Sequence, residues 1–187
     1  VDKGELYTML YRNALSGDAD CGGVVAYNFL SGEPVAAVEH GRPMYFRAPD
    51  GNFSLANFFR AQLYSAMASL KIGMDILTEN EKVSVEKLTG HGGLFKVQGV
   101  AQQLMADALR TSVSVMTTAG EGGAWGMALL AAFMQQGAGR TLPEYLDEQV
   151  FAAMEGTTAA PQQDGAEGFR RFMENYETGL AAQCFVD

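Results

Sequence analysis

Glycine residues are concentrated in one turn near the middle of the chain, Thr89-Gly90-His91-Gly92-Gly93-Leu94-Phe95-Lys96. The residues before Gly90 read as a short strand and residues 100–109 as an amphipathic helix, which predicts a strand-to-helix turn. Glycine accepts a positive φ and lets a ligand approach the main chain closely. The following helix offers unpaired N–H groups and a partial positive charge, which suit a polar ligand group. The alternative is an ordinary turn without a ligand.

A second glycine-rich segment, residues 119–126, follows the predicted strand at residues 112–117 and opens a predicted apolar helix at residues 127–135. The order strand, glycine turn, helix, repeated twice, predicts two parallel strands with helical crossovers. Both turns are then expected at the same end of the sheet. Ligands of open α/β sheets bind at the carboxyl ends of the strands, so two turns indicate a site more strongly than one.

Three ligand classes fit glycine turns, and the residues argue against two of them. A dinucleotide fold requires a third glycine where Phe95 stands and an acidic residue after the next strand, which ends in Thr117 and Thr118. A phosphate-binding P-loop requires Gly-Lys-Ser/Thr, but Lys96 follows Phe95 and precedes Val97. The third class is the actin-like ATPase arrangement, in which two glycine turns of one domain hold the base and ribose of a nucleotide.

The composition is that of a folded globular protein, with 187 residues, 48% hydrophobic and 19% charged. The net charge of −9 argues against nucleic acid as a partner, because phosphate binding needs clustered Lys and Arg. No run reaches the ~18 apolar residues of a membrane helix, and no signal-peptide pattern is present, so we expect a cytoplasmic protein without a membrane partner. Because a helix is predicted almost directly after Val1, we expect the chain to be a piece of a longer protein.

No metal site and no catalytic residue are assigned in this chain. Asp18 and Asp20 lie in a glycine-rich loop that lacks the alternating ligands and the closing Glu of a calcium loop. His40 has no partner at metal-ligand spacing. Cys21 and Cys184 also lack such spacing and are expected as free thiols.

Hydrophobic periodicity and turn chemistry predict the remaining elements. Helices are expected over residues 5–15, 54–77, 100–109, 127–135, 142–154 and 165–185, and further strands over residues 24–30 and 44–46. Ser54 is the predicted N-cap of the longest helix. Residues 156–164 are small and polar and are expected as a linker. The last helix presents one apolar face, which we expect to pack on the domain: Phe169, Phe172, Met173 and Tyr176.

Several ordered segments resemble the C-terminal domain of the FGGY carbohydrate kinases, the family of xylulokinase, ribulokinase and glycerol kinase. The turn at residues 92–97 resembles the family's Gly-Gly-Gly-Ala-Lys-Ser turn, and residues 103–109 resemble its Gln-x-Leu-Ala-Asp-x-Leu segment. Further similar segments are the Arg-Ala-x-Leu helix start at residues 60–63, the small-residue helix start at residues 123–132 and the Leu-Ser-Gly-Glu segment within residues 27–33.

The resemblance implies an α/β fold of the actin-like ATPase (ribonuclease H-like) type, with parallel βαβ units in a central sheet flanked by helices. Residues 1–155 would form part of the C-terminal actin-like domain, and residues 156–187 a linker and a helix that packs on it. The implied function is that of an ATP-dependent sugar kinase of the pentulose type. It would bind ATP with Mg²⁺ and a sugar, and it would contact the protein's own N-terminal domain. A homodimer is also considered.

The resemblance also implies which residues contact the nucleotide. The glycine turn would contact the adenosine, and the helix before Arg60 would face it. The candidate cofactor-binding residues are therefore Gly92, Gly93, Leu94, Phe95, Lys96, Val97 and Asn57. The catalytic Asp, the phosphate loops and most Mg²⁺ ligands are expected upstream of Val1, so that the isolated chain would be inactive. A non-catalytic actin-like module that binds nucleotide as a regulator or scaffold is the alternative.

Overall fold

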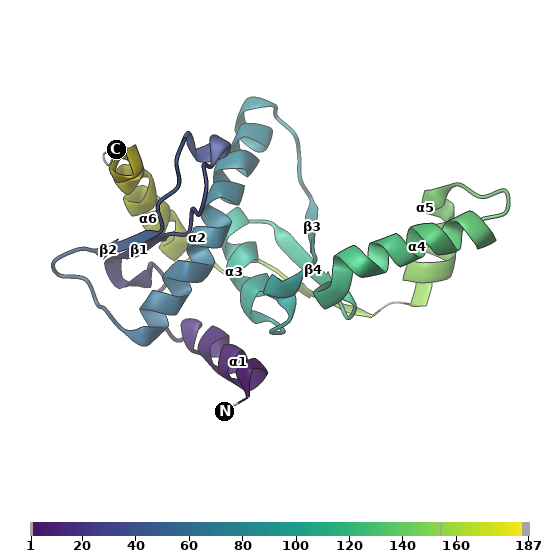
Figure 1. Ribbon diagram of the computed structural model, residues 1–187, viewed down its shortest axis with the longest axis horizontal. Helices are drawn as coiled ribbons and strands as arrows, with labels where there is room; N and C mark the ends of the chain where they lie inside the picture. Colours follow the sequence, from purple (N-terminus) through teal and green to yellow (C-terminus); the bar gives the residue numbers. More distant parts are fainter. Residues whose placement is uncertain (1, 154, 185–187) are drawn as a thin grey trace.

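The computed structural model describes residues 2–153 and 155–184 as a mixed α/β protein (Figure 1). Its helices are α1 (Lys3–Ala14), α2 (Leu55–Asp75), α3 (Val100–Leu109), α4 (Gly122–Gln136), α5 (Leu142–Tyr145) and α6 (Gln163–Leu180). Its strands are β1 (Val24–Tyr27), β2 (Met44–Arg47), β3 (Lys87–Gly90), β4 (Ser112–Met116) and β5 (Gly156–Ala159). These bounds agree with most of the predicted elements to within a few residues.

Helix α2 lies at the centre of the molecule and contacts α1, β1, α3 and α6 (Figure 1). As predicted, Ser54 caps the helix, and its side chain accepts a hydrogen bond from the backbone N–H of Asn57. The helix buries Tyr64 and Met67 completely. Because these side chains recur at helical spacing on one face, α2 presents an apolar face against which the other elements pack.

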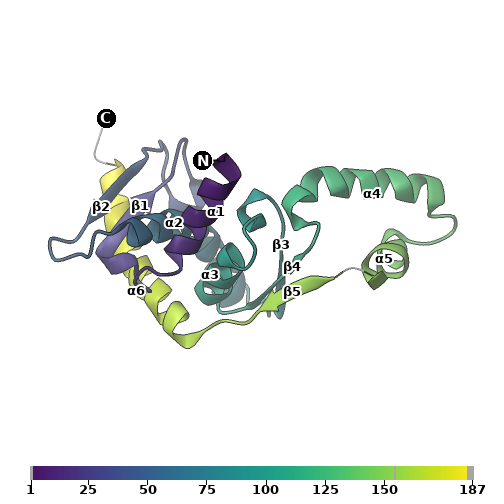
Figure 2. The same ribbon diagram turned by 90° about the horizontal axis from the view of Figure 1, so that it is seen from below.

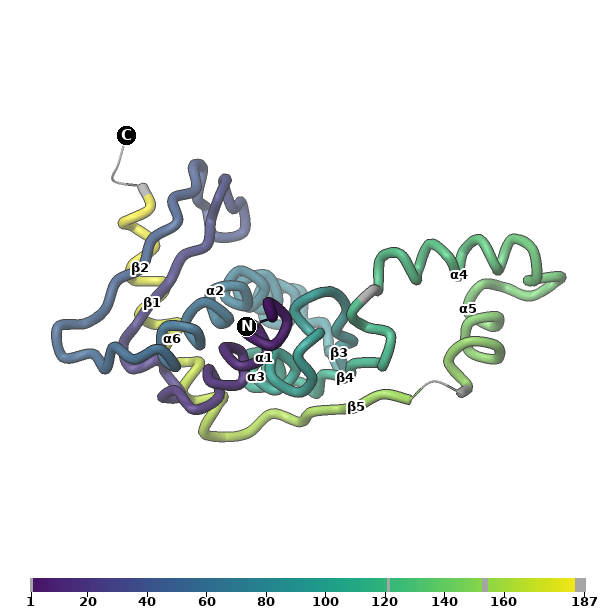
Figure 3. Tube along the Cα trace, turned by 60° about the horizontal axis from the view of Figure 1, so that its bottom comes forward, coloured from purple at the N-terminus to yellow at the C-terminus, as the bar shows by residue number. Residues whose placement is uncertain are grey.

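The C-terminal helix α6 packs against α2 and α3. The apolar face of α6 is buried, and the ring of Phe169 meets the ring of Tyr64 edge-on at a centroid distance of 4.8 Å. At the other end of α6, the hydroxyl group of Tyr27 donates a hydrogen bond to the carbonyl oxygen of Tyr176. Figure 3 shows α6 beside the two-stranded antiparallel sheet formed by β1 and β2. Residue 185, where this helix was predicted to end, lies outside the described residues.

The sheet that carries the glycine turns has three strands in the order β3-β4-β5 (Figure 2). Strands β3 and β4 are parallel, as predicted, and α3 connects them. Strand β5 pairs antiparallel with β4, so the interpretation of residues 156–159 as linker is wrong. The segment Gly-Thr-Thr-Ala is short, and its first three residues are exposed. It therefore lacks the alternation of polar and apolar residues by which a half-buried strand is recognised in a sequence. Its pairing depends on tertiary contacts that local sequence does not encode.

Helices α4 and α5 extend away from the rest of the molecule in all three views (Figures 1, 2 and 3). Residues 122–126, expected as part of a turn, form the first turns of α4, so the second glycine segment is shorter than predicted. The helix predicted at residues 142–154 is divided into α5, a π-helical turn at residues 146–150 and a 3₁₀ turn at residues 151–153. Residue 154 lies outside the described residues. None of the described helices combines the length and the apolar character needed to cross a membrane.

Candidate nucleotide site

The two glycine turns meet at one edge of the three-stranded sheet, as predicted. The backbone N–H of Gly92 donates a hydrogen bond of 2.6 Å to the carbonyl oxygen of Ala119. A Cβ atom at Gly120 would lie 3.2 Å from Cγ of Lys96, and one at Gly122 would lie 3.0 Å from Cβ of His91. Small residues are therefore needed in the second segment, because the first segment lies directly against it.

The first turn is open on its outer side. Gly92 has a φ of +101°, a conformation that favours glycine, and a Cβ atom at Gly92 or Gly93 would meet no atom within 4 Å. At Gly90 the opposite holds, since a Cβ atom there would lie 2.5 Å from Cζ of Phe95. The glycine at position 90 therefore makes room for the Phe95 ring, whereas those at positions 92 and 93 leave the main chain accessible.

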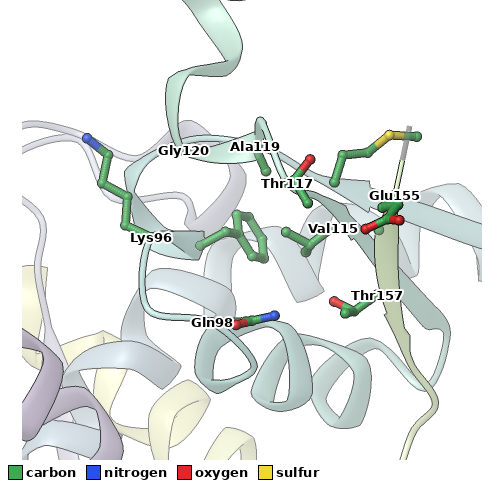
Figure 4. A pocket seen from close by; sticks show the side chains of 11 residues that line it. Lys96, Gln98, Val115, Thr117, Ala119, Gly120, Glu155 and Thr157 are labelled. Carbon is green, nitrogen blue, oxygen red and sulfur yellow. The ribbon is translucent and has the colours of Figure 1, made fainter. Parts of the chain in front are cut away.

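A pocket of about 690 Å³ lies beside the turns, at the ends of β4 and β5 (Figure 4). This volume is in the range of small-molecule sites, about 300–1,000 Å³. The pocket is lined by Phe95, Lys96, Gln98, Val115, Met116, Thr117, Ala119, Gly120, Glu155, Gly156 and Thr157. Residues of both glycine segments and of β5 therefore line the same pocket.

Four polar side chains without a formal positive charge line this pocket: Gln98, Thr117, Glu155 and Thr157. The hydroxyl group of Thr157 donates a 3.0 Å hydrogen bond to Oε1 of Gln102. Within the described part of the chain, the side chains of Gln98, Thr117 and Glu155 form no hydrogen bond or ion pair with another residue. Their polar atoms are therefore available to a ligand.

The buried amide of Gln102 holds this side of the pocket in place. Its Nε2 donates hydrogen bonds to the carbonyl oxygens of Val113, at 2.9 Å, and Thr157, at 2.8 Å. Val113 belongs to β4 and Thr157 to β5, so one side chain from α3 links both strands. Because buried amides that lose their partners are costly, this contact favours a single position for β5.

The structure brings part of the predicted site together. Phe95 and Lys96 line the pocket, and Gly92 and Gly93 lie at the open turn next to it. Leu94 and Val97 are half-buried and pack against the hydrophobic core. The packing of these two side chains holds the turn against the core.

Asn57 lies in a different polar cluster and is nearly fully buried, with 1% of its surface exposed. Its Oδ1 accepts a 2.7 Å hydrogen bond from the backbone N–H of Asp18, and its Nδ2 donates to Oδ2 of Asp18 and to the carbonyl oxygen of Asn52, both at 2.8 Å. Hydrogen bonds from Asn57 and Asn52 lower the pKa of the Asp18 carboxyl. The structure thus places Asn57 as a clamp on the loop around Asp18, apart from the glycine turns.

The pocket also contains residues that the sequence interpretation missed. Thr117 was predicted at the end of a strand and could have been included on that basis. Glu155 and Thr157 gave no such signal, because residues 156–164 were interpreted as linker and Glu155 directly precedes them. Gln98 was absent from the compared motifs.

The Gln-x-x-x-Asp part of the family-like segment has a structural role in this chain. Oδ1 of Asp107 accepts hydrogen bonds from Nε2 of Gln103, at 2.8 Å, and from the backbone N–H of Gln162, at 2.7 Å. Gln162 is the residue at the N-cap position of α6, so Asp107 ties the start of that helix to α3. Burial is the main cause that raises the pKa of the Asp107 carboxyl above its ordinary value.

The described residues contain no group of three or more His, Cys, Asp or Glu side chains that could hold a metal ion.

Comparison with known proteins identifies the family. Residues 1–135 match the C-terminal domain of the FGGY family of carbohydrate kinases. No curated protein matches the chain at a significant level.

Similar solved structures are a xylulose kinase and a gluconate kinase, both from Lactobacillus acidophilus, with TM-scores of 0.70 and 0.69. Each is 16% identical and covers 94% of this chain, which spans 34% of that structure's chain. A Plasmodium falciparum glycerol kinase solved with ADP has a TM-score of 0.68 and 15% identity, and covers all of this chain, which spans 34% of it. The chain thus corresponds to about one third of the length of these structures.

These structures confirm the prediction of an actin-like ATPase fold. Taken with the match over residues 1–135, they show that the chain belongs to the FGGY family of carbohydrate kinases and contains the family's C-terminal domain.

Proposed function

We propose that this chain is the nucleotide-binding portion of an ATP-dependent carbohydrate kinase, which transfers the γ-phosphoryl group of ATP to a sugar hydroxyl. One observation carries the proposal: in a chain of the FGGY family, two glycine turns meet beside a pocket of about 690 Å³ and leave Gly92 and Gly93 open. A pentulose such as xylulose is the proposed sugar, because xylulose kinases are among the similar structures.

In this proposal the residues of the chain bind and orient the nucleoside. Gly92 and Gly93 let the base or ribose lie against bare main chain, and Phe95 supplies an apolar wall. Leu94 and Val97 hold the turn by packing on the core, while Lys96 lies at the rim. Asn57 is left out of the proposed site, because its amide is already occupied by Asp18 and Asn52.

The remaining catalytic parts are proposed to lie outside this chain. Phosphoryl transfer requires a base for the sugar hydroxyl, a phosphate cradle and Mg²⁺, which neutralises the charge that develops on the phosphates. The described residues contain no cluster of three or more His, Cys, Asp or Glu side chains that could hold a metal ion. Residues 1–155 are proposed as part of one actin-like domain, which would work with a further N-terminal domain of the same cytoplasmic protein.

The test uses the complete protein encoded by the gene, assayed with ATP, Mg²⁺ and D-xylulose, gluconate or glycerol. We expect phosphorylation of at least one of these compounds by the complete protein and none by residues 1–187 alone. ATP binding without phosphorylation would favour a regulatory or scaffold module instead. Turnover by residues 1–187 alone would refute the assignment of the catalytic parts to another segment. Light scattering of the same sample tests whether the protein is a homodimer.

A further inference from the structure

One wall of the pocket comes from β5 and the residue before it, outside the residues that match the family. The match ends at residue 135, whereas Glu155 directly precedes β5 and Thr157 lies within it. Figure 4 shows Lys96 and Gln98 on one side of the pocket and Glu155 and Thr157 on the other. This wall therefore adds chemistry that the family's shared segments do not specify.

The chemistry of this wall is that of a hydrogen-bond acceptor. An ionised carboxylate accepts hydrogen bonds at both oxygens and donates none. The hydroxyl proton of Thr157 is used in the bond to Oε1 of Gln102, so that oxygen also faces a ligand as an acceptor. A ligand group that binds here must therefore supply donors.

The position of the Glu155 carboxylate is restrained through its backbone. The backbone N–H of Thr117 donates a 3.2 Å hydrogen bond to the carbonyl oxygen of Glu155, and the β4–β5 ladder begins at the next residue, with Gly156 opposite Met116. Among the described residues, no cation pairs with this carboxylate, and Figure 4 shows the amino group of Lys96 on the far side of the pocket. The carboxylate thus keeps its full acceptor capacity for a ligand.

The charge of the wall determines which part of a nucleotide it can face. Phosphate oxygens carry negative charge and are repelled by a carboxylate that has no neighbouring cation. Ribose hydroxyl groups are neutral donors, and two neighbouring hydroxyls can bond to the two oxygens of one carboxylate, as acidic residues do in other nucleotide sites. Ribose is therefore the part of ATP that fits this wall.

We propose that Glu155 recognises the 2′- and 3′-hydroxyl groups of the nucleotide's ribose and so makes the site selective for ribonucleotides over their dideoxy forms. This inference deepens the proposed function, on which it rests. Loss of a charge-assisted hydrogen bond of this kind should weaken affinity roughly 10- to 150-fold.

The experiment measures binding of ATP and of 2′,3′-dideoxy-ATP to the complete protein by calorimetry. Glu155→Ala is compared with Glu86→Ala, which removes the same charge from an exposed residue that does not line the pocket. We expect Glu155→Ala to weaken ATP binding at least 10-fold, to change dideoxy-ATP binding less than twofold, and so to abolish the preference for ATP. Glu86→Ala should keep wild-type affinity for both nucleotides.

Each outcome separates the two proposals. If the wild-type protein binds neither nucleotide, the proposed function fails. If it binds ATP but Glu155→Ala changes both nucleotides equally or neither of them, the proposed function stands and the role of Glu155 is refuted. Thermal unfolding of both variants verifies that they are folded, and Glu155→Gln, which keeps one acceptor oxygen, should fall between wild type and Glu155→Ala.

Discussion

The backbone N–H of Gly92 donates a hydrogen bond to the carbonyl oxygen of Ala119, 27 positions along the chain, and this bond joins the two glycine turns. Each turn follows a strand of the parallel pair β3–β4, so the bond fixes them at the carboxyl edge of one sheet. Because Gly92 has a φ of +101°, few other residues could make this contact without strain. The geometry of the candidate site therefore begins with a main-chain contact, and the pocket side chains are arranged around it.

Gly93→Val tests whether a nucleotide lies against the open turn. A Cβ atom at position 93 meets no protein atom within 4 Å, and the residue does not have a positive φ, so the variant should fold normally. If the nucleoside occupies that space, the added side chain should weaken ATP binding about 10-fold or more, a loss of about 1.4 kcal/mol. Calorimetry with the complete protein measures the change. Unchanged affinity in a folded variant would contradict the placement of the nucleotide.

Gly90→Ala tests the opposite role of a neighbouring glycine. Its Cβ atom would lie 2.5 Å from Cζ of Phe95, so the ring must move, and overpacking of this kind costs about 1–3 kcal/mol. We expect a lower denaturant midpoint. Combining Gly90→Ala with Phe95→Leu should recover part of this loss, because the smaller side chain vacates the space. Equal destabilisation in the presence and absence of the ring would show that Phe95 is not the cause.

The sequence predicted the elements in which apolar residues recur with a clear period or which are bounded by turn residues. It also predicted that the two glycine turns would lie at the same end of the sheet. It did not predict β5, because the exposed residues 156–159 are specified by pairing with β4 and by the amide of Gln102, which comes from α3. Long-range hydrogen bonds of this kind leave no local pattern. Three of the eleven residues that line the pocket, Glu155, Gly156 and Thr157, were missed for this reason.

Asn57 shows that motif comparison can select a residue whose side chain already holds another part of the chain. Its position near a family-like segment suggested a ligand contact, yet polar residues at helix starts are often needed to hold neighbouring loops. In this chain the side chain is 1% exposed, and its three hydrogen bonds join it to Asp18 and Asn52. Sequence spacing alone could not distinguish a buried clamp from a ligand contact.

Asn57→Ala should therefore lower stability and leave nucleotide affinity unchanged. The substitution removes three hydrogen bonds and leaves the backbone N–H of Asp18 without its acceptor, at a cost of about 1–3 kcal/mol. Chemical unfolding measures the loss of stability, and calorimetry below the unfolding transition measures ATP binding. Asn28→Ala is the control, since that amide is exposed and donates a single hydrogen bond of 3.3 Å to the carbonyl oxygen of Gln62. A selective loss of ATP affinity in Asn57→Ala would return this residue to the site.

Asp107→Asn should change how stability depends on pH. Burial raises the pKa of the Asp107 carboxyl in the folded state, so the folded protein favours the protonated form. The stability gained from protonation is fully present below the unfolded-state pKa, about 3.9, and is lost as the pH rises through the raised folded-state pKa. An amide cannot ionise, so the unfolding free energy of Asp107→Asn should rise relative to wild type as the pH increases from about 3.5 to 7. Urea unfolding at several pH values measures this, with Asp164→Asn, an exposed acid in the first turn of α6, as the control. Parallel pH profiles for wild type and Asp107→Asn would show that the buried carboxylate carries no such cost.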